Sequence, residues 1–352
     1  MPIPVISSAR GLAYQPEVEI QCGVALAGFD APERHAAVLA AVQDRPGVEL
    51  REPTEHGLAP VHAVHDPDMV SFLETAWERL SPLRPDPERK LVFPDTFPHP
   101  GFGAALAAGS LERVGGLGEL GRYCFDTITG IGPGTYGAAR SSADVALTAA
   151  DAVLAGASLA LSLNRPPGHH AAPTMFGGAT FLNNAAIAAQ ALRAGGLARV
   201  AVLDVDFHHG NGTQAIFYDR PDVLFVSLHG APARTWPFFS GWPEERGAGD
   251  GEGHNHNIVL PPGIEGVRYR ELLAGALDVV RAFDAQALVV SLGFDTAAGD
   301  PAGDAALDDA DFHAIAGDIA ATGLPMLTIL EGGYLLDRLT GQLTAWLDGA
   351  GA

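Results

Sequence analysis

Residues 199–212 read RVAVLDVDFHHGNG, an apolar run that ends in acidic residues and histidines. A short Val- and Leu-rich run bounded by polar residues is typical of a strand that is buried on both faces of a parallel sheet. Four other stretches share this pattern: ASLALSLNRPPGHH (157–170), DVLFVSLHG (222–230), AQALVVSLGFD (285–295) and LPMLTILEGGY (324–334). The five runs predict an α/β fold built around a central, mostly parallel sheet.

Helical patterns separate these runs, at residues 141–156, 183–196, 267–283 and 308–323. Glycines stand where two of these helices should stop. The alternation predicts right-handed crossovers, helices that flank the sheet, and a single catalytic domain over residues 1–352. A Pro- and Gly-rich segment at about 81–121 is predicted as a long loop excursion that rims a site or meets another subunit, and residues 247–257 as a second loop.

Composition excludes several classes of protein. The formal net charge of -21 repels nucleic-acid phosphates, so we expect no nucleic-acid partner. Cys22 and Cys124 are too few for a disulfide scaffold and suit a reducing compartment. With no apolar run of about 18 residues and no signal-peptide pattern, we expect a soluble cytoplasmic protein without a membrane partner.

Polar residues that follow the apolar runs are the candidate metal ligands, because ligands bind at the carboxyl ends of parallel strands. Side chains alternate along a strand, so Asp204, Asp206 and His208 are predicted to point to one side. Asp206, His208 and Asp295 would offer one imidazole and two carboxylates to a catalytic zinc ion. Such an ion lowers the pKa of bound water, which can then attack a carbonyl.

Proton-transfer groups accompany these ligands. His169 and His170 would serve as general base and acid. Asp204 and Asn211 are candidates for the acceptors that fix their tautomers, and Tyr334 would donate to a developing oxyanion. A histidine pair alone is more often structural, but its position beside the other motifs predicts hydrolysis.

The motifs together resemble the zinc-dependent histone deacetylase family of the arginase/deacetylase superfamily, and within it the bacterial acetylpolyamine amidohydrolases. The stretches that carry the resemblance include CFDTITGIGPGTYGAA (124–139), RPPGHHA (165–171), MFGGATFLNNAAIAAQ (175–190), LDVDFHHGNGTQAIFY (203–218), LGFDTAAGDP (292–301) and LEGGY (330–334). The resemblance runs from about Val61 to the C-terminus. It implies a single-domain arginase/deacetylase fold with the active site at the C-terminal ends of the strands.

The same resemblance implies a role for each matching residue. Zinc ligands are Asp206, His208 and Asp295, the tandem histidines are His169 and His170 with partners Asp204 and Asn211, and the catalytic tyrosine is Tyr334. Asp126 matches a rim aspartate that holds the substrate amide N–H, and Gly178 a backbone contact to the acyl chain. A monovalent-cation site, usually potassium, maps to Asp204, Asp206, His208, Ser227 and Leu228, and a weaker second one to Phe217 and Val223.

One metal ion per chain is expected, as zinc or alternatively ferrous iron. The two-manganese arginase branch needs D-x-D at the last strand end, whereas Thr296 and Ala297 follow Asp295 here. A homodimer is also expected, because the long loop supports dimerisation in the polyamine branch. The acidic loop residue that recognises the cationic end of the substrate in that branch has no sure counterpart in Glu112 or Glu119.

The channel residues depart from the family pattern. Ala179 stands where the family carries an aromatic residue that forms one wall of the acyl-lysine tunnel. The facing wall is expected from Phe238 or Phe239. Loss of an aromatic wall removes a stacking surface worth roughly 1 kcal/mol and widens the channel.

These observations predict a metal-dependent amidohydrolase that removes an acyl group, in the first place acetyl, from an acetylpolyamine-like small cationic amine. One alternative substrate is an acyl-lysine side chain in a protein or peptide. Another is a specialised small-molecule amide that needs the wider channel at Ala179. The remaining alternative is a regulatory module that has lost its catalytic activity.

Overall fold

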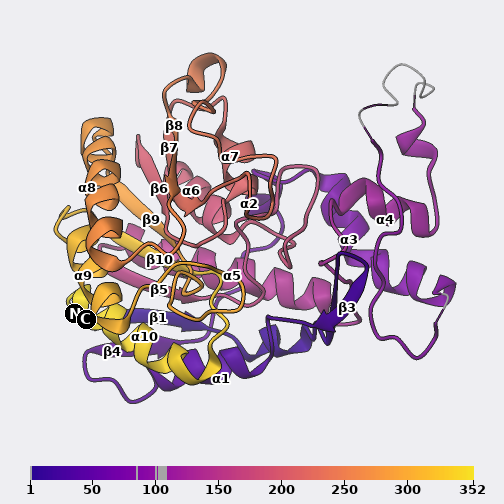
Figure 1. The fold of residues 1–352 in the computed structure, drawn as a ribbon, viewed down its shortest axis with the longest axis horizontal. Coiled ribbons are helices and arrows are strands. Elements are labelled where there is room, and N and C mark those ends of the chain that lie inside the picture. The colour runs from indigo at the N-terminus through magenta and orange to yellow at the C-terminus, as the bar shows by residue number, and fades with distance from the viewer. Residues whose placement is uncertain (1, 85, 100, 102–108) are drawn as a thin grey trace.

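The computed structural model describes residues 2–84, 86–99, 101 and 109–352 (Figure 1). Eight strands form one sheet in the order β4-β1-β5-β10-β9-β6-β7-β8, and every neighbouring pair is parallel. The strands are β1 (Ile3–Ser7), β4 (Val48–Arg51), β5 (Leu159–Leu163), β6 (Val200–Asp204), β7 (Val223–Gly230), β8 (Asn255–Leu260), β9 (Ala287–Leu292) and β10 (Met326–Leu330). A separate antiparallel hairpin pairs β2 (Val18–Gln21) with β3 (Val24–Ala27).

The four central strands, β5, β10, β9 and β6, are buried along their whole length. Their apolar side chains face two hydrophobic cores, one on each side of the sheet. This arrangement explains the continuous apolar runs in the sequence, since neither face of these strands meets water. The predicted α/β fold with a mostly parallel central sheet is confirmed.

Helices cover both faces of the sheet, with α5 and α6 on one face and α8, α9 and α10 on the other (Figure 1). The bounds are α1 (Glu33–Ala40), α2 (Ala59–His62), α3 (Pro67–Leu80), α4 (Leu117–Tyr123), α5 (Thr135–Leu154), α6 (Asn184–Ala194), α7 (Asn211–Phe217), α8 (Gly266–Phe283), α9 (Asp309–Ala320) and α10 (Leu336–Gly349). The four predicted helices correspond to α5, α6, α8 and α9. Beyond the ends of α6 and α9, Gly196 and Gly323 adopt positive φ angles of 105° and 71°, as helix-stopping glycines do.

Three strands of the eight-stranded sheet, and both strands of the β2–β3 hairpin, were not predicted from the sequence. Strand β1 and the edge strand β4 are short and lie far from the motif-bearing runs in sequence. Strand β8 begins at Asn255, inside the predicted loop 247–257, so that expectation was wrong at its C-terminal end. Its alternating Asn side chains point inward, and those of Asn255 and Asn257 both donate hydrogen bonds to Gln214. A strand whose buried residues are polar and hydrogen-bonded lacks the apolar pattern of a buried strand, so its sequence resembles that of a loop.

The predicted loop excursion 81–121 contains short helical turns, η2 (Ser81–Leu83) and η4 (Leu111–Arg113), and ends in α4. Residues 85, 100 and 102–108 of this segment lie outside the described residues. Together with α3 and the β2–β3 hairpin, the described part of the excursion occupies the side of the molecule away from α8 and α9 (Figure 1). Among the described residues, no helix combines the length and the apolar composition needed to cross a bilayer.

Candidate active site

Four adjacent strands deliver the predicted site residues to one edge of the sheet. The order β5-β10-β9-β6 places the segment after β5, with His169 and His170, beside the segment after β10, with Tyr334. Asp295 follows β9, and Asp206 follows β6. Strands that are distant in sequence are neighbours here, which is why four separate motifs form one site.

The three predicted metal ligands meet at the ends of β6 and β9. Ligand atoms of Asp206, His208 and Asp295 all lie within 4.8 Å of one another. Nδ1 of His208 is 2.9 Å from Oδ2 of Asp295 and 3.4 Å from Oδ1 of Asp206. One imidazole nitrogen and two carboxylate oxygens are a donor set that zinc accepts, with a further position left for water.

Backbone amides hold both carboxylates in place. Gly332 donates to Oδ2 of Asp206, and Phe207 donates to Oδ1 of Asp295, each at 2.9 Å. Contrary to expectation, Asp206 and His208 do not alternate along a strand, since β6 ends at Asp204. Asp206 and His208 lie on the bend that follows β6. The backbone N–H of His208 donates to Oδ1 of Asp206, and this hydrogen bond closes the bend and turns His208 back toward Asp206.

Burial and mutual charge perturb this cluster strongly. Burial lowers the pKa of His208, but hydrogen bonds and charge from Asp206 and Asp295 outweigh it and raise the pKa to about 10. Burial and the charge of Asp206 raise the pKa of Asp295 to about 7. Two buried carboxylates that share one imidazole attract positive charge, which a divalent cation would supply.

The tandem histidines have different partners. Nδ1 of His169 lies 2.9 Å from Oδ2 of Asp204, and Nδ1 of His170 lies 2.8 Å from Oδ1 of Asn211. Each acceptor places the proton on Nδ1, so Nε2 of each ring is directed away from it. Nε2 of His169 is 3.7 Å from Oδ1 of Asp206, and His170 lines the cleft.

Their pKa values move in opposite directions. Burial disfavours the charged form of His169, but the charges of Asp204 and Asp206 outweigh it and raise its pKa well above the ordinary value. Burial lowers the pKa of His170 well below that value, and the neighbouring His169 and His208 lower it further. The surroundings therefore favour the charged form of His169 and the neutral form of His170.

Tyr334 is held by a buried ionic scaffold. The guanidinium of Arg34 donates to the carbonyl oxygens of Glu331 and Gly333, each at 2.7 Å, and to Oδ1 of Asp30 at 2.6 Å. It also lies 5.0 Å from the ring centre of Tyr334. Burial raises the pKa of Tyr334 well above its ordinary value, so its hydroxyl keeps the proton that an oxyanion would accept.

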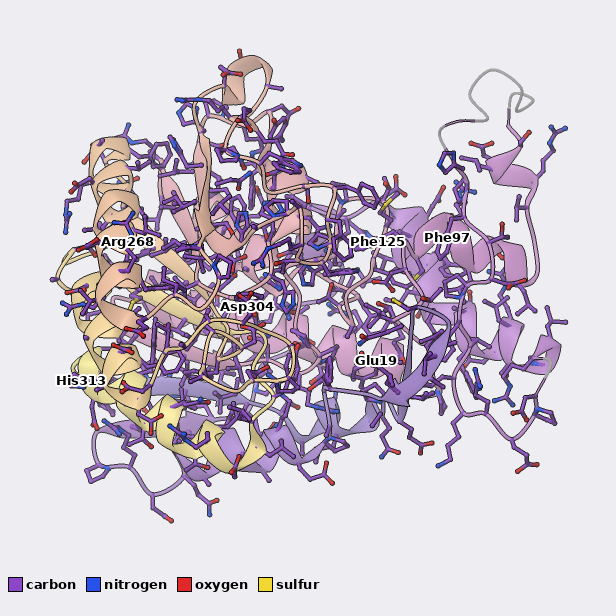
Figure 2. The ribbon with its side chains drawn as sticks, viewed as in Figure 1. Glu19, Phe97, Phe125, Arg268, Asp304 and His313 are labelled. Carbon is purple, nitrogen blue, oxygen red and sulfur yellow. The ribbon has the colours of Figure 1, made fainter. Side chains whose placement is uncertain are left out.

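A cleft of about 620 Å³ leads to these groups and is lined by His170, His208 and Tyr334 among others. Its aromatic wall is Trp236, whose ring centre lies 4.5 Å from that of His170 in an edge-on arrangement. Phe125 stacks on Trp236, with the two ring centres 5.9 Å apart. Phe97, from the 81–121 excursion, also lines the cleft and lies on the same side of the molecule as Phe125 and Glu19 (Figure 2).

The predicted facing wall is only partly in place. Phe238 lines the cleft, but Phe239 is 92 % exposed and is absent from the lining. The residue that packs against His170 is Trp236, two positions earlier. A lone Trp before a Pro in TWPFFSG was the available signal. Ala179 lines the cleft, has a φ of 58° and is 7 % exposed, and it contributes only a methyl group to the lining.

The other predicted substrate contacts, Asp126 and Gly178, are bonded to each other. The Asp126 carboxylate accepts N–H groups from Ile128, Thr129 and Gly178. A side chain at Gly178 would collide with His170 and Trp236, since a Cβ there would be 2.4 Å and 2.5 Å from their rings. Both residues line the cleft.

The predicted inner cation site maps onto neighbouring strand ends. Asp204 on β6 is in register with Ser227 on β7, and Leu228 follows Ser227. Asp204 also takes part in the bond to His169, so this group of residues abuts the proton-transfer pair. Phe217 and Val223, matched to the second site, lie at the end of α7 and the start of β7.

Two positioning carboxylates were not singled out from the sequence. Oε2 of Glu331 accepts the N–H groups of Gly168 and His169, at 2.7 and 3.2 Å, and thus holds the histidine turn. Oδ2 of Asp300 accepts the N–H of Tyr334 at 2.7 Å. Both residues stand inside the quoted motifs, in LEGGY and GFDTAAGDP, which was the signal that could have identified them.

Comparison with known proteins matches the chain to a family. The model of the histone deacetylase domain matches residues 29–350. An acetylpolyamine amidohydrolase of Mycoplana ramosa is 43 % identical over 318 residues, which are 90 % of this chain and 91 % of the relative. Acetylpolyamine amidohydrolase 1 of Pseudomonas aeruginosa is 43 % identical over 88 % of each chain. The crystal structure of an acetylpolyamine aminohydrolase from Burkholderia pseudomallei superposes with a TM-score of 0.92 and 38 % identity, covering 99 % of both chains.

Proposed function

The chain belongs to the histone deacetylase family, and from this premise we propose that it is a metal-dependent amidohydrolase that releases acetate from a small acetylated polyamine. The observation that carries the proposal is the meeting of four strand ends. They bring together a candidate metal-ligand triad, two differently bonded histidines and a tyrosine, and of these groups His170, His208 and Tyr334 line one cleft. The alternative of an inactive regulatory module is set aside, because the set of reacting groups is complete.

The ligand triad fits zinc, as described above. Zn²⁺ bound by Asp206, His208 and Asp295 would polarise the substrate carbonyl and lower the pKa of water beside it. Nε2 of His170 removes the proton from the attacking water, because Asn211 holds the ring's other proton on Nδ1. A C–O bond forms, the C–N bond breaks, and His170 returns the proton to the leaving amine nitrogen.

Two further groups stabilise the developing negative charge. The Tyr334 hydroxyl donates to the carbonyl oxygen as it becomes an oxyanion. His169 keeps its proton because Asp204 and Asp206 surround it, so it contributes positive charge beside the reacting centre. The products are a carboxylate and a free amine.

The substrate class follows from the relatives and from charge. The relatives named above are acetylpolyamine amidohydrolases, and a protein with a net charge of -21 attracts cationic amines. An acyl-lysine side chain carries no amine charge near the amide, so we place acyl-lysine peptides second.

Amine release from acetylputrescine and acetylspermidine, compared with an acetyl-lysine peptide, tests the proposal. We expect turnover of the acetylpolyamines that stops after chelation and returns with Zn²⁺. Asp206→Ala should lose both activity and bound metal, measured by elemental analysis. A metal-loaded protein that hydrolyses none of these amides would contradict the proposal.

A second candidate activity, hydrolysis of amides with larger acyl groups, is favoured by Ala179. The residue lines the cleft beside Gly178 with only a methyl group. An acyl chain longer than acetyl would fit where the family places an aromatic ring. Comparing acetyl, butyryl and hexanoyl forms of one polyamine tests this candidate directly.

We also propose the metal content of the chain: one zinc ion, with ferrous iron as the alternative, and a potassium ion at Asp204, Asp206, His208, Ser227 and Leu228. We also propose a homodimer that uses the 81–121 excursion, a single catalytic domain over 1–352, and a cytoplasmic location. Elemental analysis and light scattering of the purified chain test the metal content and the oligomeric state.

A further inference from the structure

We propose that Asp304, at the rim of the cleft, binds the cationic end of the substrate, and that Arg234 competes with the substrate for this carboxylate. The inference rests on the proposed function, because it concerns a substrate with a free ammonium group. Both residues line the same cleft as the catalytic groups. Nη2 of Arg234 lies 3.3 Å from Oδ2 of Asp304.

The loop that carries Asp304 is fixed to the reacting centre. Gly303 packs directly on the metal ligand Asp295, since a Cβ on Gly303 would be 2.0 Å from the Asp295 carbonyl oxygen. Asp300 accepts the N–H of Ala302 at 2.9 Å and that of Tyr334 at 2.7 Å. Asp304 therefore stands at a set distance from the site of amide cleavage, as a second anchoring point for an extended substrate must.

Three other carboxylates line the cleft, but each of them is already bonded within the protein, Asp30 through one of its two oxygens. Asp30, 1 % exposed, is paired with Arg34 and Arg165. Glu19, 2 % exposed, accepts from the Phe29 N–H and from Gln21.

Asp126, the third, accepts three backbone N–H groups. Among the described residues that line the cleft, Asp304 is thus the carboxylate with a half-exposed side chain, 50 % accessible. The loop residues Glu112 and Glu119 are absent from this lining.

Arg234 is the only lysine or arginine among the described residues that line the cleft. It lies in the turn after β7, two residues before the aromatic wall Trp236, and its side chain is 52 % exposed. An ion pair this exposed is worth at most about 1 kcal/mol. A substrate ammonium that is already held nearby by the acyl group can displace it at high effective concentration.

The consequence is selectivity for substrates whose cation reaches the rim. A substrate with an ammonium group gains the contact with Asp304, whereas a neutral amide of the same length gains nothing. Arg234 opposes binding of the cationic substrate in two ways: it occupies the carboxylate of Asp304, and its positive charge repels that of the substrate. It thereby weakens binding of cationic chains without touching the reacting atoms.

The test is the ratio of kcat/KM for an acetylated diamine to kcat/KM for a neutral acetamide of equal length with a terminal hydroxyl group. We expect Asp304→Asn to lower this ratio about two- to fivefold, through KM, and Arg234→Gln to raise it by a similar factor. Raising the salt concentration should shrink the effect of both substitutions. The ratio cancels any general loss of folded enzyme.

Arg268→Gln is the matched control. Arg268 lies on α8, is similarly exposed and pairs with Glu271, and Figure 2 shows it well apart from Asp304. This control removes the same charge, so it should leave the ratio unchanged. An unchanged ratio in Asp304→Asn, or an equal shift in Arg268→Gln, would overturn the inference while wild-type turnover still supports the proposed function. A wild type inactive on both substrates would instead overturn the proposed function and this inference with it.

Discussion

At the residue scale, chemical roles depend on the partner that each side chain meets. His169 and His170 are adjacent in sequence, yet one faces the carboxylate of Asp204 and the other the amide of Asn211. The carboxylate stabilises a charged imidazole, whereas the amide only fixes the tautomer. Two identical side chains thus acquire different proton affinities.

Tyr334→Phe removes the hydroxyl that would donate to the oxyanion and leaves the ring between Phe29 and Arg34. Loss of one such donor typically lowers kcat by about 10²- to 10³-fold. We expect that loss in a steady-state assay, with unchanged metal content and unfolding midpoint. Full activity in the variant would show that Tyr334 is not the oxyanion donor.

Ala179→Tyr should narrow the cleft and restore an aromatic wall. We expect turnover of hexanoyl amides to fall more than that of acetyl amides. Ala179→Gly is the matched control: it keeps the space and relieves the positive φ of 58°, so selectivity should stay as in the wild type. An unchanged acyl-chain profile in the Tyr variant would mean that Ala179 does not set selectivity.

At the scale of elements, strand ends and helix starts position the chemistry. The proposed metal ligands follow β6 and β9, and backbone N–H groups from the adjoining turns bind their carboxylates. Helix α9 begins shortly after the loop that carries Asp304, and it begins with a capping box. In this box the side chains of Asp308 and Asp311 each accept the other residue's backbone N–H. The capped N-terminus of α9 therefore fixes the C-terminal end of the loop that carries Asp304.

Asp308→Ala removes this cap. We expect the free energy of unfolding to fall by about 1 kcal/mol, because one helix N–H loses its acceptor. Urea unfolding curves measure this loss, and we expect the slope of unfolding free energy against urea concentration to be unchanged. Asp308→Asn, which can still accept this hydrogen bond, should stay within a few tenths of the wild type; an equal loss in both variants would argue against the cap.

At the scale of the whole molecule, buried histidines join distant segments. His65, after α2, is 2 % exposed. Its Nδ1 donates to the Ala172 carbonyl at 2.9 Å, and its Nε2 accepts the Asn183 N–H at 2.8 Å. Both bonds require the neutral ring, and burial lowers the pKa of His65 to about 4.

This shift predicts acid-sensitive stability. An unfolded histidine has a pKa of about 6.5. Between pH 6.5 and 4 the unfolded state therefore binds the extra proton, and the stability that His65 contributes at neutral pH declines by about 3 kcal/mol as the pH falls. The difference in unfolding free energy between wild type and His65→Ala should shrink by this amount from pH 7 to pH 4. A difference that stays constant with pH would contradict the prediction.

The sequence alone determined the class of fold and the candidate reacting groups. Buried parallel strands need continuous apolar runs, and their polar ends mark the ligand edge of the sheet, so local patterns reveal both. This is why Asp206, His208, Asp295, His170 and Tyr334 could be selected without coordinates. The ends of α6 and α9 followed from similar local signals, namely Gly196 and Gly323.

Only the tertiary structure decided which residues from distant segments contact these candidate reacting groups. The insertion of β10 and β9 between β5 and β6 brings motifs together that are up to 165 residues apart (169 to 334). Trp236 rather than Phe239 forms the wall, Arg34 holds the Tyr334 turn, and Asp304 stands at the rim beside Arg234. These are contacts between distant segments, set by packing and charge in three dimensions, and no periodicity within a segment encodes them.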